Sequence, residues 1–88
     1  MDAIEFREQL KRRTKAFALR VIRLYQSLSN NTESQIIGKQ LLRSATSVAA
    51  NYRAACRSRS NAEFYSKIGI VIEEADESLF WLEMLTEA

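Results

Sequence analysis

The chain has 88 residues, of which 47% are hydrophobic and 27% are charged, and this composition excludes a disordered segment. It contains one cysteine and no histidine, which excludes a disulfide framework and any Cys/His zinc site. No apolar run approaches the roughly 18 residues of a membrane span, and the N-terminal residues lack the apolar core of a signal peptide. We therefore expect one domain over residues 1–88, in the cytoplasm and without a membrane partner.

The net charge of +2 hides a division along the chain. Residues 1–60 hold twelve Lys and Arg against four acids, whereas residues 61–88 hold one Lys against seven acids. Such asymmetry indicates a basic surface for nucleic acid, or two halves that neutralise each other within or between chains. A chain this short buries only about 60 to 65% of its unfolded surface, so oligomerisation is also expected.

The first expected helix covers about residues 3–28, because six apolar residues recur at intervals of 4, 7, 4, 3 and 4. This spacing places them in one narrow stripe: Phe6, Leu10, Phe17, Val21, Leu24 and Leu28. The turn-forming run SNNTES follows at residues 29–34. In it, Thr32 and Gln35 fit a capping box that would start the next helix.

The second expected helix covers about residues 33–56. Its apolar arc is Ile37, Leu41, Ala45, Val48, Ala49, Tyr52 and Cys56. Four polar residues at intervals of 4, 3 and 4 form a stripe beside this arc: Gln40, Ser44, Ser47 and Asn51. Buried polar groups are usually paired for structural reasons, so we interpret the stripe as a seam for helix packing; a ligand-binding seam is the alternative.

The third expected helix covers about residues 61–87 and starts at the box formed by Ser60 and Glu63. Its broad apolar face comprises Phe64, Ile68, Val71, Ile72, Ala75, Leu79 and Leu82. A second apolar group falls on the opposite side: Ile70, Phe80, Trp81 and Met84. One helix cannot easily hide both faces against two neighbours, so we expect a further helix or another subunit there.

The expected fold is therefore all-α. It is an antiparallel up-down helical bundle of the four-helix type, with three helices present in this chain and the fourth missing. The sequence stops at LTEA while the third helix is still in phase, which favours this interpretation.

Several segments, in order, resemble one known family. Gln40 and Arg43 match its Q-x-x-R start, SATSVAANYRAA its Ser-rich second helix, and EEADESLFWLEML its third helix, while Arg59, Ser60 and Glu63-Phe64 match the junction between them. On these residues the chain resembles the four helix bundle proteins encoded by intervening sequences in bacterial 23S ribosomal RNA genes. The resemblance is close over about residues 36–85, and the first helix matches only by pattern.

That resemblance implies an antiparallel four-helix bundle that assembles as a ring-shaped homopentamer. The family is distantly similar to the accessory proteins of diversity-generating retroelements, which bind nucleic acid and a reverse transcriptase. The absence of a fourth helix is the one large departure from the family pattern.

Catalysis is the weakest of the function classes. The dense carboxylates Glu73, Glu74, Asp76 and Glu77 have no histidine with which to build a di-metal site. Cys56 has no histidine as its base, so it is interpreted as a core residue. We expect no catalytic residue, no metal, no cofactor and no small-molecule substrate. The carboxylates are expected to pair with arginines of the first two helices.

Basic residues surround the apolar stripe of the first helix and gather near the end of the second. A charged helix face is often only a solvated face, whereas its repetition around a symmetric ring would make weak phosphate contacts cumulative. The candidate nucleic-acid-binding residues are Lys11, Arg12, Arg13, Lys15, Arg20, Arg23, Arg53, Arg57 and Arg59.

The candidate residues for the helix-packing or subunit-interface seam are Gln40, Arg43, Ser44, Ser47, Asn51, Phe80 and Trp81. Ser47 and Asn51 are expected to join the second helix to its neighbours. The functional hypothesis is a non-enzymatic oligomeric accessory protein that binds RNA or DNA through the first two helices. The alternative is a protein-interaction scaffold that recruits a partner through the third helix, with no nucleic-acid role.

Overall fold

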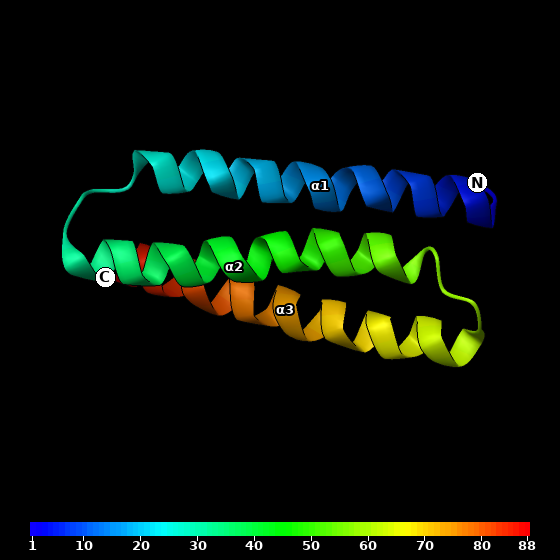
Figure 1. Ribbon diagram of the computed structural model, residues 1–88. Helices are drawn as coiled ribbons and strands as arrows, with labels where there is room; N and C mark the ends of the chain where they lie inside the picture. The colour runs from blue at the N-terminus through cyan, green and yellow to red at the C-terminus, as the bar shows by residue number, and fades with distance from the viewer.

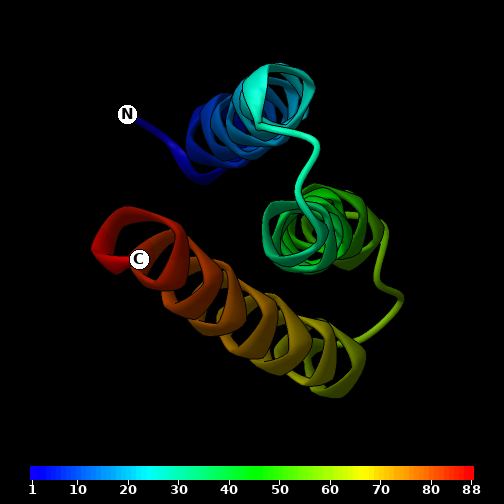
Figure 2. The same cartoon turned by 90° about the vertical axis from the view of Figure 1, so that its left-hand side faces the viewer.

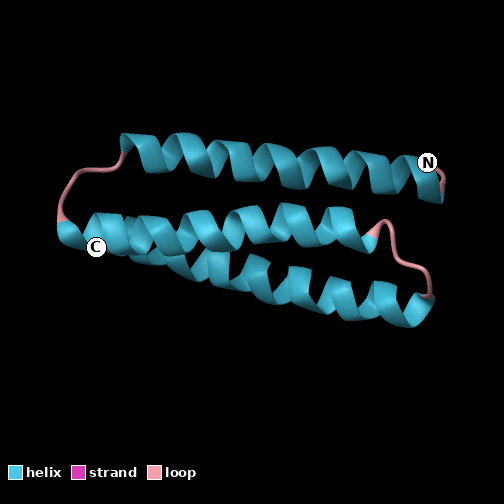
Figure 3. Ribbon diagram, in the orientation of Figure 1, coloured by secondary structure: helices cyan, strands magenta, loops and turns pink.

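The computed structural model describes residues 1–88 and contains three α-helices and no strand (Figure 3). The helices are α1 (Ala3–Ser27), α2 (Thr32–Ala55) and α3 (Asn61–Glu87). The sequence placed them at about 3–28, 33–56 and 61–87, so the ends of the first two differ by one residue. Consecutive helices run antiparallel, with α2 between the other two (Figure 1). The expected all-α class is confirmed.

Polar caps start α2 and α3. At α3, Ser60 is the N-cap as the sequence suggested, and its hydroxyl accepts from the Glu63 amide at 3.1 Å. At α2 the N-cap is Asn31 and not Thr32, because the Asn31 side-chain oxygen accepts from the Ser34 amide at 2.8 Å. Both side chains satisfy an amide that has no partner inside its own helix, and this fixes where the helix begins.

Helix α2 supplies most of the core. The innermost cluster joins Val21 of α1 to Leu41 and Ala45 of α2, which are 4%, 1% and 0% exposed. The other fully packed apolar residues are Ala18, Val48, Tyr52 and Ala55. Small residues in α2 let both neighbours approach its backbone closely. No Cα of α1 comes within 8 Å of a Cα of α3, so the backbones of the two outer helices stay apart (Figure 2) and α2 makes the main contacts with both.

An open apolar groove therefore lies between α1 and α3, with α2 as its floor. Two consecutive hollows of about 400 and 420 Å³ form it, and the residues that line them include Phe6, Leu10, Phe17, Tyr52, Phe64, Ile68, Leu79 and Leu82. The expected burial of both apolar stripes is only partly met. Leu24, Phe6 and Leu79 remain 37%, 55% and 54% exposed, and Ser78 is the one fully buried residue of α3.

The second apolar group of α3 is divided by the packing. Phe80 and Met84 stay 48% and 39% exposed, whereas Trp81 packs partly buried against the Val21–Leu41–Ala45 cluster. Phe80 and Trp81 meet edge to face, with ring centroids 4.9 Å apart. Trp81 therefore belongs to the edge of the core and not to a separate outer face. None of the three helices combines the length and apolarity that a membrane crossing demands.

Candidate nucleic-acid interface

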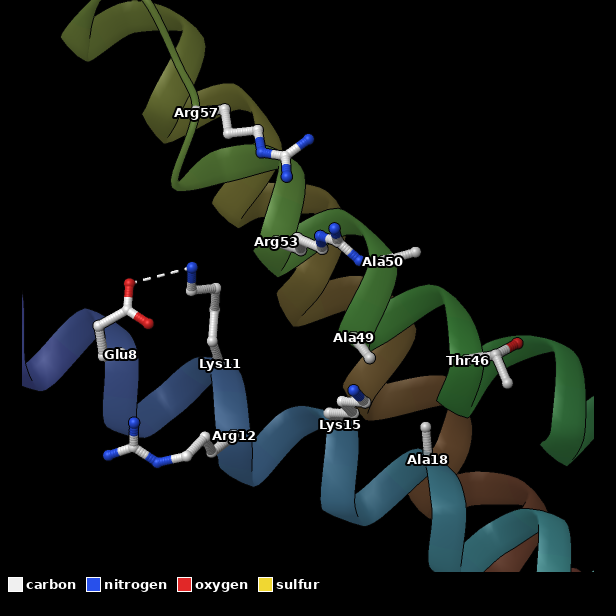
Figure 4. Close-up of a pocket in the computed structure, with 10 residues that line it drawn as sticks. All are labelled: Glu8, Lys11, Arg12, Lys15, Ala18, Thr46, Ala49, Ala50, Arg53 and Arg57. Atoms are coloured by element: carbon white, nitrogen blue, oxygen red, sulfur yellow. Dashed lines mark ion pairs between the residues drawn. The ribbon is translucent and has the colours of Figure 1, made fainter.

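Five cationic side chains line one groove between α1 and α2. The groove has a volume of about 550 Å³ and is bordered by Lys11, Arg12 and Lys15 from α1 and by Arg53 and Arg57 from α2 (Figure 4). Its other lining residues are Glu8, Ala18, Thr46, Ala49 and Ala50. Five of the nine predicted nucleic-acid-binding residues are thus brought together by the fold.

The convergence follows from helix geometry. Lys11 and Lys15 lie one turn apart on α1, and Arg53 and Arg57 lie one turn apart on α2, so each pair is separated by about 6 Å along its helix. Because α1 and α2 run antiparallel side by side (Figure 1), both rows border the same groove. Figure 4 shows Lys11 extending toward α2, whereas Arg12 points away from it.

Glu8 is the one acidic residue of this groove. Its carboxylate pairs with the Lys11 ammonium at 3.0 Å, and both side chains are partly exposed, at 52% and 34%. An exposed pair three residues apart is weak and is easily exchanged for a stronger anion. The groove therefore keeps a clear excess of positive charge.

The remaining four predicted cations lie elsewhere. Arg13 lines the apolar groove between α1 and α3, and Arg59 lies in a polar hollow of about 280 Å³ at the α2–α3 junction. Arg20 and Arg23 are exposed on the C-terminal half of α1. In that junction hollow Arg59 is accompanied by Arg7, which stacks over the Phe64 ring at 5.8 Å. The structure thus does not unite all nine residues in one surface.

Arg43, a predicted seam residue, joins α2 to α3 by charge. Its guanidinium donates to the Glu74 carboxylate at 3.2 Å and also to the Glu77 carboxylate. The hydrogen bond from Arg43 lowers the pKa of Glu77 below its ordinary value, and the same bond raises the pKa of Arg43. These two acids belong to the carboxylate group that the sequence paired with arginines, so Arg43 already has anionic partners within its own chain.

The polar seam is built by different bonds than the spacing suggested. Ser44 is fully buried, and its hydroxyl accepts from the Ser78 hydroxyl of α3 at 2.9 Å. Asn51 instead donates to the carbonyl and hydroxyl oxygens of Ser47 at 2.9 and 2.8 Å, within α2. The bond between helices that we expected from Ser47 and Asn51 is therefore made by Ser44. Gln40 is half-buried.

Tyr52 anchors the core beside this seam. It is only 3% exposed, and this burial, together with the nearby Cys56 thiol, raises its pKa to about 12. The uncharged phenol is the form that tolerates a site away from water.

No group of three or more Cys, Asp or Glu side chains is placed to hold a metal ion.

Sequence reasoning missed the floor of the groove and one half of the seam. Thr46, Ala49 and Ala50 precede Arg53 and Arg57 on one row of α2, and a search for small residues at intervals of three and four beside the arginines would have indicated them. Ser78 carried no comparable signal, because a serine among acids and apolar residues does not reveal its partner.

Fold and groove together define a small all-α protein with a cationic groove between two helices. The model of the family described as 23S rRNA-intervening sequence protein matches residues 7–88. The chain therefore belongs to this family, as its motifs suggested.

The chain is also similar to a solved structure, a protein of unknown function from the S23 ribosomal protein family of Bacteroides thetaiotaomicron VPI-5482. The two are 38% identical, the match covers 92% of this chain and 72% of that chain, and the TM-score is 0.85. No curated protein matches the chain.

Proposed function

We propose that this protein is a non-enzymatic, cytoplasmic, oligomeric helical bundle that binds RNA or DNA through the groove between α1 and α2. The convergence of four cationic side chains from two helices on one groove, with Arg12 at its border, is the observation that carries the proposal. Clustered Lys and Arg neutralise phosphates and release counterions, which is the main source of sequence-independent affinity.

A titration at two salt concentrations tests the proposal. Fluorescently labelled structured RNA and duplex DNA are titrated with the protein, and binding is followed by anisotropy at 50 and 200 mM KCl. Phosphate contacts predict binding at 50 mM that weakens steeply at 200 mM. Absence of binding to both nucleic acids at 50 mM salt would refute the proposal.

We further propose that the bundle is of the four-helix type, with the fourth position at the apolar groove between α1 and α3. Phe6, Ile72 and Leu79 are more than half exposed along or beside this groove, so a helix laid on it would bury a continuous apolar surface. ANS fluorescence measures the exposed apolar surface directly. A dye signal no higher than that of a fully packed domain would argue that the groove is closed in another way.

The proposed assembly is a homopentamer, which the family resemblance implied. Light scattering coupled to size exclusion would then give five times the chain mass of 10.1 kDa. A ring would present several basic grooves to one nucleic acid, and the combined binding would exceed that of a single groove. A monomeric mass at all concentrations would remove this part of the proposal.

A second candidate function is a protein-interaction scaffold. It is favoured by Ile70, Phe80 and Met84, which are 40%, 48% and 39% exposed on α3. Since Trp81 packs against the core, Phe80→Ser is a cleaner test than a change at Trp81. The scaffold predicts that this substitution abolishes capture of a partner while leaving salt-dependent nucleic-acid binding intact. Capture that survives Phe80→Ser would count against the scaffold.

A further inference from the structure

The lining of the basic groove indicates which form of nucleic acid it accepts. Its floor consists of Ala18 of α1 together with Thr46, Ala49 and Ala50 of α2, so it presents methyl groups and one hydroxyl beside its cations. No aromatic side chain and no side-chain amide lines the groove. It therefore lacks the aromatic rings on which bases stack and the side-chain amides that read adenine.

The two rows of cations match the shape and charge of a convex, negatively charged ligand surface such as a sugar–phosphate backbone. Lys11 and Lys15 flank the groove on α1, and Arg53 and Arg57 flank it on α2, each pair about 6 Å apart. A backbone strand of a duplex advances about 3.4 Å along the axis per nucleotide, so one helical turn of protein meets about two phosphates of a strand. The methyl floor fits the apolar carbons of the sugars between those phosphates.

Single strands and duplexes differ in what they offer such a surface. Proteins that bind single strands gain much of their affinity from bases that stack on aromatic side chains, and this groove supplies none. A duplex hides its bases, presents its sugar–phosphate backbone as the outer ridge and has the higher charge density. The surface thus matches the duplex and forgoes the chief attraction of a single strand.

We infer that the α1–α2 groove binds the sugar–phosphate backbone of double-helical nucleic acid in preference to single strands, without selecting a base sequence. This inference rests on the proposed nucleic-acid binding and adds the class of ligand. Four cations face the groove, and Lys11 is shared with Glu8, so three to four phosphate contacts are expected per groove.

The salt dependence follows from this number. With a slope of about −0.9 per contact, three to four contacts on a duplex weaken the affinity by about 40- to 150-fold between 50 and 200 mM salt. Several grooves acting on one duplex would multiply the slope, but the fractional effect of removing half of the cations would stay the same.

The test compares one labelled 20-base-pair RNA duplex, the DNA duplex of the same sequence and an unstructured RNA strand of the same length. Anisotropy titrations at 50, 100 and 200 mM KCl use the full chain and three variants. Lys15→Gln/Arg57→Gln removes one cation from each row, and Lys39→Gln/Lys67→Gln removes the same charge outside the groove. A third variant, Ala50→Leu, fills the floor at an exposed position without changing the charge.

We expect both duplexes to bind at least about tenfold more tightly than the single strand at 50 mM salt. The groove variant should lose about half of the salt slope, the matched control should lose much less, and Ala50→Leu should weaken duplex binding at unchanged charge. Circular dichroism of each variant shows whether the helices are intact.

The possible failures are distinguishable. Equal or tighter binding of the single strand would overturn the inference while leaving nucleic-acid binding in place. Duplex binding that responds equally to both double substitutions would overturn the assignment to this groove. No binding of any of the three probes at 50 mM salt would overturn the proposed function itself.

Discussion

Two glycines in helices make a matched pair for testing how closely α1 and α2 approach. A Cβ added at Gly38 of α2 would lie 2.7 Å from Leu28 Cδ1 and 2.9 Å from Tyr25 Cδ1, both from the end of the α1 segment. A Cβ added at Gly69 of α3 meets nothing within 4 Å. Both sites are in helix interiors, so Ala is intrinsically favoured at each by about 1 kcal/mol.

The difference between Gly38→Ala and Gly69→Ala isolates the cost of the overlap, because the gain in helix propensity is common to both. The Tyr25 ring cannot simply withdraw, since its hydroxyl donates to Gln35 at 2.9 Å. Inserting a methyl group into a packed site costs about 1–3 kcal/mol. Gly69→Ala should therefore stabilise the protein by up to about 1 kcal/mol, and Gly38→Ala should be less stable than Gly69→Ala by about 1–3 kcal/mol.

Urea unfolding and thermal melts at one fixed protein concentration measure both variants. For a domain of this size 1 kcal/mol corresponds to about 4–8 °C, so the two melting temperatures should differ by at least about 4 °C. Leu28→Ala removes the atom nearest to the added methyl group. In the Leu28→Ala background, Gly38→Ala should therefore lower the stability by less than it does in the wild type. Equal stabilisation by both glycine substitutions would refute the close approach of α1 to α2.

Three further predictions concern α2 and its partners. Ser78→Ala should lower the free energy of unfolding by about 0.5–1.5 kcal/mol in chemical denaturation. Because the two hydroxyls bond to each other, the double variant Ser44→Ala/Ser78→Ala should lose less stability than the sum of the two single variants. Strictly additive losses would argue against this bond. Arg43→Gln should reduce stability at pH 7. Arg43 lowers the pKa of Glu77, so the wild type should be more stable than Arg43→Gln above pH 4.5, the ordinary glutamate value. This difference in stability should disappear as the pH falls through the lower native pKa of Glu77. Thermal melts over a pH series measure it, and a difference that is unchanged at pH 2 would contradict the prediction. Tyr52 has a pKa raised to about 12, so its contribution to stability is complete below pH 10 and is lost as the pH rises toward 12. In absorbance titrations, Tyr52→Phe should remove a phenolate transition near pH 12. The same transition in the variant would disprove the assignment.

The fold was largely predictable because each helix carries its own signals. Apolar spacing located all three, and the Ser60 cap located the start of α3. Asn31 and Thr32 are both cap formers in adjacent positions, so sequence alone could not decide between them, and the side chain of Asn31 takes the role. Such a choice depends on local backbone geometry, which letters do not show.

The candidate site was less predictable because it depends on contacts between helices. The sequence named Lys15 and Arg53, but their convergence requires the antiparallel register that places α1 beside Ala49 and Ala50 of α2. Arg13 is only two residues from Lys15 and yet lines the other groove. Likewise, the apolar pattern of α3 did not show that Ser78 would be its most buried residue, because that depends on Ser44 lying opposite.

Helix α2 makes the main contacts with both other helices, and α1 packs on it less extensively than α3 does. Detaching α1 would sever its interface with α2 and the Arg7–Phe64 contact, and would leave the α2–α3 hairpin with its Arg43 and Ser78 bonds intact. The α1–α2 junction is therefore where we expect partial opening of the fold to begin. The cationic groove lies across this junction, so a ligand that contacts Lys15 of α1 and Arg57 at the end of α2 together would hold the two helices in place and stabilise the less extensive of the two helix interfaces.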